Sequence, residues 1–464
     1  MKNILGLIRN VFKKFFDRIR NEKIKLNLLQ AIPFWVASLV TGLIAVVFTK
    51  LFAFVEEESS FVFQHAAWAF FIITPLCFII SWQLVKRLAP YSRGSGIPQV
   101  MAAAELSTPK YNYLVGQLLS LKIIVVKIFS TLIMAFGGGV VGREGPMIQI
   151  AGSIFRKINQ LLPAWWPKIS KRNMINAGAA AGLAAAFNTP LGGIVFAVEE
   201  LTKTHISYFK TALFTAVIIA GLTAQGLLGP YLYLGYPNVN DLSSWMFLSV
   251  IVVAIVAGLA GSTMSKMILL IFRWKAKFKK TSFQYVYAIT SAIGIATFAF
   301  LIDERVFGSG KIIMTTALFT PEKYVAWYVP LMRIGGTMIS FTMGGSGGVF
   351  APALAAGASI GSLFSSWFHL SATDTNLLIL CGMVSFLTGV TRTPFTSAIL
   401  VLEMTDRHSV IFQLMLAGMV ASLVSLLIDK HSFYEHLKIQ YMHELLKDEE
   451  PNAGKKAEVS GDIR

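Results

Sequence analysis

Long apolar stretches dominate the pattern of hydrophobic and polar positions along this chain of 464 residues. Runs long enough to cross a bilayer as a helix, about 20 residues, recur over residues 32–54, 66–85, 113–136, 244–272, 283–302 and 407–428. Charged residues gather mainly in the connections between these runs. The pattern therefore predicts an all-α protein that crosses a membrane several times.

Composition and charge support a membrane location. Hydrophobic residues make up 55% of the chain and charged residues only 14%. A soluble protein could not bury so many apolar residues in its core. The net charge of +17 is concentrated at the N-terminus and in connections such as 168–172 and 273–280. Because anionic lipid headgroups attract such basic segments, they explain the charge better than nucleic acid does.

The two ends of the chain are predicted to lie in the cytoplasm. The first 25 residues carry eight basic side chains and two acids, and basic segments favour the cytoplasmic side. Residues 1–28 are predicted to form an amphipathic helix on the membrane surface. Residues 431–464 are predicted to form a cytoplasmic helix and tail, too short for a folded regulatory domain. We expect the protein in the inner (plasma) membrane.

An internal repeat relates the two halves of the chain at a spacing of about 205 residues. The segment around Pro146 is similar to the one around Pro352, and residues 177–201 are similar to 381–405, which pairs Glu199 with Glu403. Chance similarity between Gly- and Ala-rich segments is the alternative. Repeats in transporters are often inverted in the bilayer, so we expect residues 29–228 and 229–430 to form two inverted repeats with broken, tilted helices.

Three glycine-rich motifs each end in proline and open an apolar stretch: GSGIP, GREGP and GVFAP. Glycine allows close backbone approach, proline suits a first helical turn, and the free amides of a helix N-terminus attract anions. Each motif alone could be a simple helix break or packing notch. Together, in duplicated halves, they predict an anion site. Their residues are Gly94, Ser95, Gly96, Ile97, Pro98, Gly142, Arg143, Glu144, Gly145, Pro146, Gly348, Val349, Phe350, Ala351 and Pro352.

In this order and spacing, the three motifs resemble the signature of the CLC chloride channel and transporter family, over roughly residues 30–440. The resemblance implies a chloride held by the Ser95 hydroxyl, the amides of Val349 and Phe350, and the Tyr434 hydroxyl. Tyr434 could equally be an ordinary interfacial aromatic residue. The resemblance also implies a homodimer, with chloride, protons and membrane lipid as partners.

Two acids are candidates for proton transfer. Glu144 lies inside the expected anion site, where its carboxylate can compete with an anion and act as gate and external proton acceptor. Pairing with Arg143 is the alternative. For the internal proton transfer site the resemblance points to Glu200, and the repeat agrees, because Glu200 aligns with Met404 while Glu199 and Glu403 match. Contact with water or Lys203 at a helix end is the alternative for Glu200.

Two further positions bear on the expected site. Lys127 lies deep in an apolar stretch, so it either faces a polar partner near Ser95 or snorkels to the interface. Lys122, nearer the end of that stretch, is expected to snorkel. Gln99 stands where the family usually carries Glu, which puts the charge near the inner vestibule in doubt.

The sequence thus predicts a secondary active chloride/proton antiporter rather than an enzyme, with no metal and no cofactor apart from the bound chloride. A passive, voltage- or pH-gated chloride channel of the same fold is the nearest alternative. A structural or lipid-processing membrane protein is a rival of another class. Fluoride export is disfavoured because Ser95 and Pro146 fit the chloride-type motifs.

Overall fold

The computed structural model describes residues 16, 21–202, 210–229, 232–240, 242–243, 245–278, 280–302, 305, 307–321, 323–368 and 370–447. The tail beyond 447 and most of the predicted surface helix over 1–28 lie outside these residues. Residues 22–28 form the start of the first long helix. Regular structure in the described part is helical, with two isolated β-bridges.

The first half of the chain contains the helices α2 (Glu22–Ala66), α3 (Phe70–Leu88), α4 (Ile97–Glu105), α5 (Val115–Leu118), α6 (Leu121–Phe136), α7 (Glu144–Leu161), α8 (Lys171–Phe187), α9 (Pro190–Phe196), the π-helical segment η3 (Ala197–Thr202) and α10 (Lys210–Leu228). The second half contains α11 (Met246–Lys275), α12 (Thr281–Leu301), α13 (Lys311–Phe319), α14 (Tyr328–Thr342), α15 (Phe350–Trp367), α16 (Ala372–Thr391), α17 (Pro394–Thr405) and α18 (Ile411–Ser425). A last helix, α19 (Phe433–Lys447), follows.

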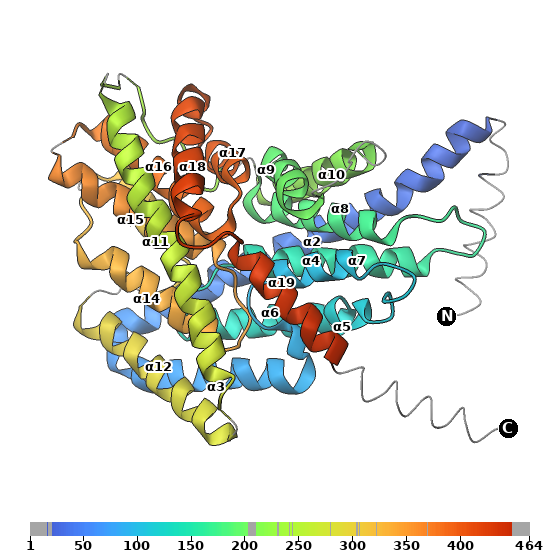
Figure 1. Cartoon of the computed structure of the whole chain (residues 1–464), viewed down its shortest axis with the longest axis horizontal. Coiled ribbons are helices and arrows are strands. Elements are labelled where there is room, and N and C mark those ends of the chain that lie inside the picture. The colour runs from blue at the N-terminus through green and yellow to red at the C-terminus, as the bar shows by residue number, and fades with distance from the viewer. Residues whose placement is uncertain are drawn as a thin grey trace.

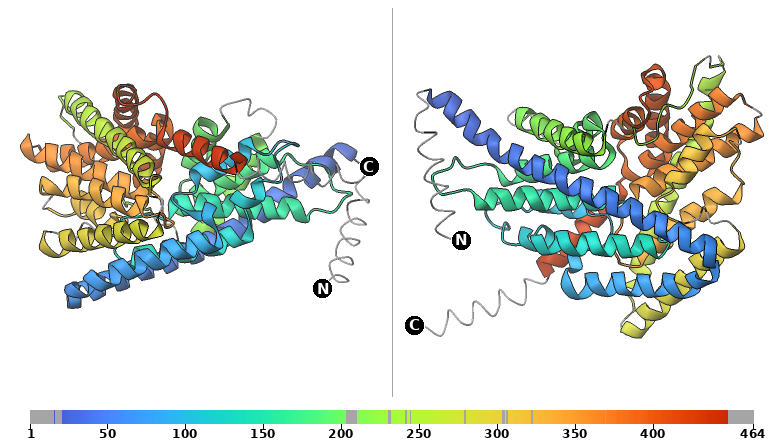
Figure 2. Two further views of the ribbon diagram at one scale, coloured as in Figure 1. Left: turned by 60° about the horizontal axis from the view of Figure 1, so that its bottom comes forward. Right: turned by 180° about the vertical axis from the view of Figure 1, so that it is seen from behind.

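Seven helical stretches in the described part are long and apolar enough to cross a membrane, and the six runs predicted from the sequence fall in five of them, because Glu22–Leu88 contains two. Large apolar side chains point outward from several of them, such as Val47, Ile72 and Leu423, each more than half exposed. A lipid surrounding accounts for this exposure. By contrast, α16 is enclosed by α11, α15, α17 and α18. Figure 2 shows α2, in dark blue, crossing the whole molecule obliquely.

The same local rules shape corresponding helices in the two halves. Ser170 caps the start of α8 and Ser371 caps the start of α16, each by accepting a hydrogen bond from a backbone amide three residues on. Both helices end at a residue with left-handed backbone, Asn188 and Arg392. The next helices, α9 and α17, begin at Pro190 and Pro394, which confirms the alignment of residues 177–201 with residues 381–405.

The helices also pack in equivalent pairs: α7 on α8 and α15 on α16, α8 on α10 and α16 on α18, and α2 on α10 and α11 on α18. Figure 1 shows most of the first half in blue and green and the second in yellow to red, side by side. Helix α19 crosses back from the second half to pack on α4. The predicted all-α fold with two inverted repeats is confirmed, and the reciprocal contacts described below show the inversion directly.

Candidate anion site and proton-transfer residues

The motifs of the two halves meet at a backbone pair. Gly142 and Gly348, which occupy equivalent positions in the repeats, exchange two hydrogen bonds, N to O at 2.8 and 2.7 Å. A reciprocal, antiparallel pair of equivalent residues is what a local two-fold axis produces. The expected convergence of the Pro146 and Pro352 segments is therefore confirmed.

The third motif joins the same junction. Gly94 donates to the Gly345 carbonyl at 2.7 Å, and its own carbonyl accepts from Gly347 at 3.1 Å. Directly beyond this junction α4, α7 and α15 begin, at Ile97, Glu144 and Phe350. The first amides of a helix have no partner within it and carry partial positive charge. Three helix N-termini thus start around one buried point, as the motifs predicted.

Glycine is required where the motifs touch. Gly96 has a φ of +107°, and a Cβ there would lie 2.9 Å from the carbonyl oxygen of Gly145. At Gly145 a Cβ would lie 2.2 Å from the Ser95 hydroxyl oxygen. Because these distances are shorter than van der Waals contact, side chains at either position would push α4 and α7 apart. The glycines therefore allow the Ser95 hydroxyl to lie directly against the start of α7.

Two hydroxyl groups lie together at this point with unmet hydrogen-bonding capacity. Ser95 and Tyr434 are fully buried, and neither hydroxyl has a partner of normal geometry in the described part of the chain. The Tyr434 ring stacks on Phe350, with centroids 6.2 Å apart and planes 12° apart. Since buried polar groups are seldom left unpaired in proteins, the two hydroxyls and the start of α15 define a place for a polar or anionic ligand.

Glu144 lies where the GREGP motif of the first half meets the GVFAP motif of the second half. Its side chain is 1% exposed, and its carboxylate reaches the backbone amides of Glu144 itself and of Ala351 in α15. The atom Oε2 has no hydrogen-bond partner within the described residues. Arg143 forms no ion pair with Glu144; its guanidinium lies over the rings of Phe52 and Tyr233, at 5.9 and 6.0 Å. The carboxylate thus occupies helix-end amides that an anion could also use.

The paired acids of the repeat cap each other's helices. The Glu199 carboxylate accepts from the amides of Phe395 and Thr396 at the start of α17, at 3.2 and 2.7 Å, and from the Thr396 hydroxyl at 2.7 Å. The Glu403 carboxylate accepts from Leu191 and Gly192 at the start of α9, at 2.9 and 2.7 Å. The expectation that acids shared by both halves are structural fits these contacts.

Glu200 lies in a different environment from its neighbour. It belongs to the π-helical segment η3 and is 4% exposed, so it does not stand in open water. Its charge and that of Glu144 both act on the Tyr434 hydroxyl. Lys203, the suggested partner of Glu200, lies outside the described residues. Both acids therefore lie within electrostatic range of the Tyr434 hydroxyl.

Lys127 is fully buried, and its ammonium donates to the carbonyls of Ser92 and Gly94 at 2.8 and 2.7 Å. The snorkelling alternative is wrong for Lys127, whereas Lys122 is exposed. The Ser346 hydroxyl also donates to the Ser92 carbonyl, at 2.6 Å. The segment that carries Ser95 is thus held in place by the buried Lys127 ammonium and by the Ser346 hydroxyl from the second half. Sequence reasoning missed Ser346, whose only signal was its position inside a glycine-rich motif.

Gln99 has a structural task that Glu could not perform in its ionised form. Its amide nitrogen donates to the carbonyls of Tyr91 and Arg93, at 3.2 and 2.7 Å. Gln149 on α7 donates to the same Tyr91 carbonyl at 3.0 Å. A carboxylate has no proton to donate. The departure at Gln99 therefore stabilises the turn before Ser95 and places no extra negative charge there.

Taken together, these features define a polytopic membrane protein with a buried candidate anion site at the axis between two inverted repeats. Comparison with known proteins agrees. The profile of the family described as "Voltage gated chloride channel" matches residues 76–426, and the chain belongs to this family, the CLC channels and transporters.

Curated relatives and solved structures give the same picture. The H(+)/Cl(-) exchange transporter ClcA of Cronobacter sakazakii is 29% identical over 83% of this chain and 84% of the relative. ClcA of Yersinia pseudotuberculosis is 28% identical over 84% of this chain and 83% of the relative. The structure of a slow cyanobacterial Cl-/H+ antiporter superposes with a TM-score of 0.77 at 22% identity, covering 89% of this chain and 98% of that one. A CLC-type fluoride/proton antiporter gives 0.72 at 22% identity, with the same coverage. At this identity, the structures show the fold.

Proposed function

We propose that this protein is a secondary active antiporter that exchanges chloride for protons across the membrane. One observation carries the proposal: the buried Ser95 and Tyr434 hydroxyls and the start of α15 surround a point that Glu144 adjoins, and within the described residues neither hydroxyl has a partner of normal geometry. Relatives named as H(+)/Cl(-) exchange transporters over more than four fifths of the chain support the same function.

In the proposed site, chloride accepts from the hydroxyls of Ser95 and Tyr434 and from the amides of Val349 and Phe350. Helix-end dipoles suit an anion that must be released again, because a full cation in direct contact with the ion would hold it too tightly. Lys127 supports this from behind, because its ammonium bonds the two carbonyls that flank Arg93 and so holds Ser95 in place.

Glu144 couples the ions by competition. As a carboxylate it occupies the amides at the junction of α7 and α15; once protonated it loses its charge and its attraction to them, and an anion can take its place. Glu200 exchanges protons between Glu144 and the cytoplasm, by way of the space around Tyr434. The burial of Glu200 and its lack of an acidic counterpart in the second repeat support this division of roles.

On this proposal both termini lie in the cytoplasm, residues 29–228 and 229–430 are the two repeats, and the protein works as a homodimer with one pathway in each subunit. Basic residues also stand at helix ends, with Lys86 and Arg87 in the last turn of α3, Lys122 in the first turn of α6 and Lys171 at the start of α8. A cytoplasmic excess of Lys and Arg is the usual determinant of orientation.

The test is chloride-driven proton movement into sealed liposomes that contain the purified protein, with a lipophilic cation to dissipate voltage. An antiporter moves protons uphill when chloride runs down its gradient. Chloride flux without any proton movement would identify a channel instead. Glu144→Gln is expected to abolish proton movement and to leave chloride flux insensitive to pH, with Glu57→Gln as a charge-matched control outside the site.

A further inference from the structure

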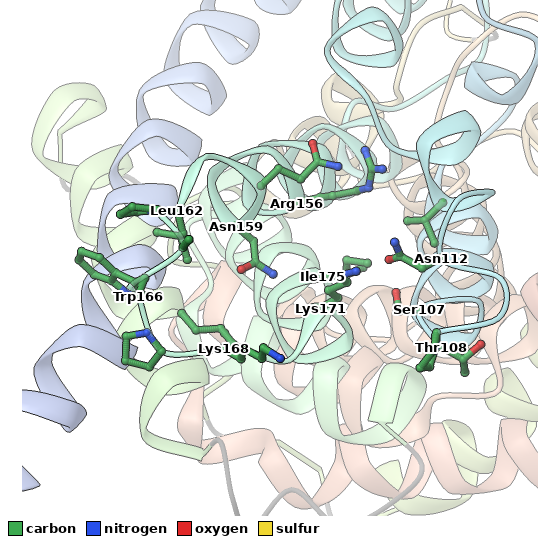
Figure 3. Close-up of a pocket in the computed structure, with 17 residues that line it drawn as sticks. Ser107, Thr108, Asn112, Arg156, Asn159, Leu162, Trp166, Lys168, Lys171 and Ile175 are labelled. Carbon is green, nitrogen blue, oxygen red and sulfur yellow. The ribbon is translucent and has the colours of Figure 1, made fainter. Parts of the chain in front are cut away.

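A cavity of about 810 Å³ lies at the far ends of α4 and α7, the ends opposite Ser95 and Glu144. Its wall comes from the connection after α4, the last turns of α7, the connection over 162–170 and the first turns of α8. Figure 3 shows its side chains arranged around a common hollow, among them Asn112, Arg156, Asn159, Lys168 and Lys171. The cavity is separate from the proposed ion pathway.

The charge of this cavity is one-sided. Arg156, Lys168 and Lys171 line it, and among the described residues no acidic side chain does. None of the three forms an ion pair with a carboxylate in the described part of the chain. Arg156 donates to the Leu119 carbonyl at 2.8 Å, which is a neutral acceptor. Three cations without counter-charges around one hollow favour an anionic occupant.

A second cavity of about 620 Å³ adjoins the first and shares Lys168 and Ile169 with it. It adds Lys210, with no acidic residue among the part of its lining that the structure describes, and it extends along α2 over the apolar side chains of Phe34 and Trp35. The two cavities together combine four cations with an apolar wall.

Tryptophan marks the depth of these cavities in the membrane. Trp166 lines the first cavity and donates to the Leu29 carbonyl of α2 at 2.6 Å, and the Trp165 ring lies next to it at 5.2 Å. Tryptophan gathers at the level of lipid headgroups. The cavities therefore lie at the membrane surface, on the side where α2 begins.

We propose that these adjoining cavities, called here the basic surface site, bind a phosphate-bearing anion. The phosphate oxygens accept hydrogen bonds from Lys168 and Lys171, with the amides of Asn112 and Asn159 as further donors. The volume is far larger than a halide requires, whereas a phosphorylated organic molecule fits it. Such an anion can be the headgroup of an anionic phospholipid, whose chains would follow the apolar side of α2, or a soluble phosphate compound.

The test uses the purified, delipidated full chain in neutral detergent and follows its melting temperature by tryptophan fluorescence. Short-chain phosphatidylglycerol, short-chain phosphatidylcholine and inorganic phosphate are each titrated, because a ligand that binds only the folded state raises the melting temperature. The variant Lys168→Gln/Lys171→Gln removes two cations from the site. Lys157→Gln/Arg172→Gln removes two neighbouring cations that do not line it.

Phosphatidylglycerol is expected to stabilise the wild type and the control variant. Its affinity should fall about 30-fold in the double variant, since each basic residue near an anionic headgroup contributes ~1 kcal/mol. Stabilisation by inorganic phosphate as well would identify the free anion as sufficient; stabilisation by the lipid alone would identify a lipid site. Equal responses to both lipids, or an unchanged affinity in the double variant, would overturn the proposal. Should the double variant fail to fold, each single exchange is expected to weaken binding about fivefold.

Discussion

Replacing Glu199 by alanine tests the structural role of the acids that the two repeats share. The exchange removes a carboxylate that accepts three hydrogen bonds from the first turn of α17, from two amides and the Thr396 hydroxyl. A hydrogen bond to a charged group contributes about 1.5–3 kcal/mol. Water or lipid headgroups can replace part of this at a half-buried site, so we expect a loss of ~3 kcal/mol in total. Glu403 accepts two such bonds, so Glu403→Ala should cost less, ~2 kcal/mol.

The assay is thermal unfolding of the purified protein, followed by loss of the monodisperse peak in size-exclusion chromatography. With an unfolding entropy near 2.1 cal/mol/K per residue, a chain of this length loses about 1 °C per kcal/mol, so Glu199→Ala should melt about 3 °C lower than the wild type. Glu199→Gln keeps one acceptor oxygen, so its melting temperature should lie between those of the wild type and Glu199→Ala. An unchanged melting temperature for Glu199→Ala, or a larger loss for Glu403→Ala, would refute the reasoning.

Three other predictions concern the site and its surroundings. Tyr434→Phe should weaken chloride binding roughly fivefold, since one net hydrogen bond contributes about 1 kcal/mol. Isothermal titration calorimetry measures the chloride affinity, and an unchanged affinity would exclude the hydroxyl as a ligand. Gly145→Ala places a Cβ 2.2 Å from the Ser95 oxygen and should weaken chloride binding more than Tyr434→Phe does, whereas Gly152→Ala on the same helix, with its nearest contact at 3.4 Å, should not. Partial burial raises the pKa of Asp429, but the His431 amide, the His436 ring and Arg392 outweigh this effect and lower the pKa overall. An aspartate with a lowered pKa in the folded state stabilises the folded protein at pH values above the ordinary aspartate pKa of about 3.9. The wild type should therefore melt higher than Asp429→Asn at pH 7, and the difference should shrink as the pH falls from about 3.9 and be lost below the lowered folded-state pKa; a constant difference would contradict it.

Much of this architecture follows from local sequence patterns. Apolar length predicts the spanning helices, and the repeat predicts that the segments around Pro146 and Pro352 meet, because inversion brings equivalent broken helices to one level. The reciprocal hydrogen bonds between Gly142 and Gly348 are the contact where these segments meet. The match of Glu199 with Glu403 likewise predicts a structural role, which their hydrogen bonds to the opposite repeat fit.

Other features depend on contacts between distant segments and carry no local signal. Whether Lys127 snorkels or turns inward is decided by the carbonyls of Ser92 and Gly94, which come from another helix connection. The donor role of Gln99 depends in the same way on the turn over 91–93. The basic surface site consists of residues from several connections and helices between α2 and α10, so periodicity along the chain could not bring them together.

The coupling role of Glu200 is tested most directly by the voltage at which net proton flux stops in liposomes with equal chloride on both sides and a fixed pH gradient. Valinomycin and a potassium gradient set the voltage, and Glu200→Gln is compared with Glu199→Gln, the same exchange one residue away. We predict that wild type and Glu199→Gln stop proton flux at a non-zero voltage fixed by chloride/proton coupling, while Glu200→Gln conducts chloride and moves no protons. Coupled proton movement that persists in Glu200→Gln would contradict the proposed path, and a wild type that carries chloride alone would contradict antiport itself.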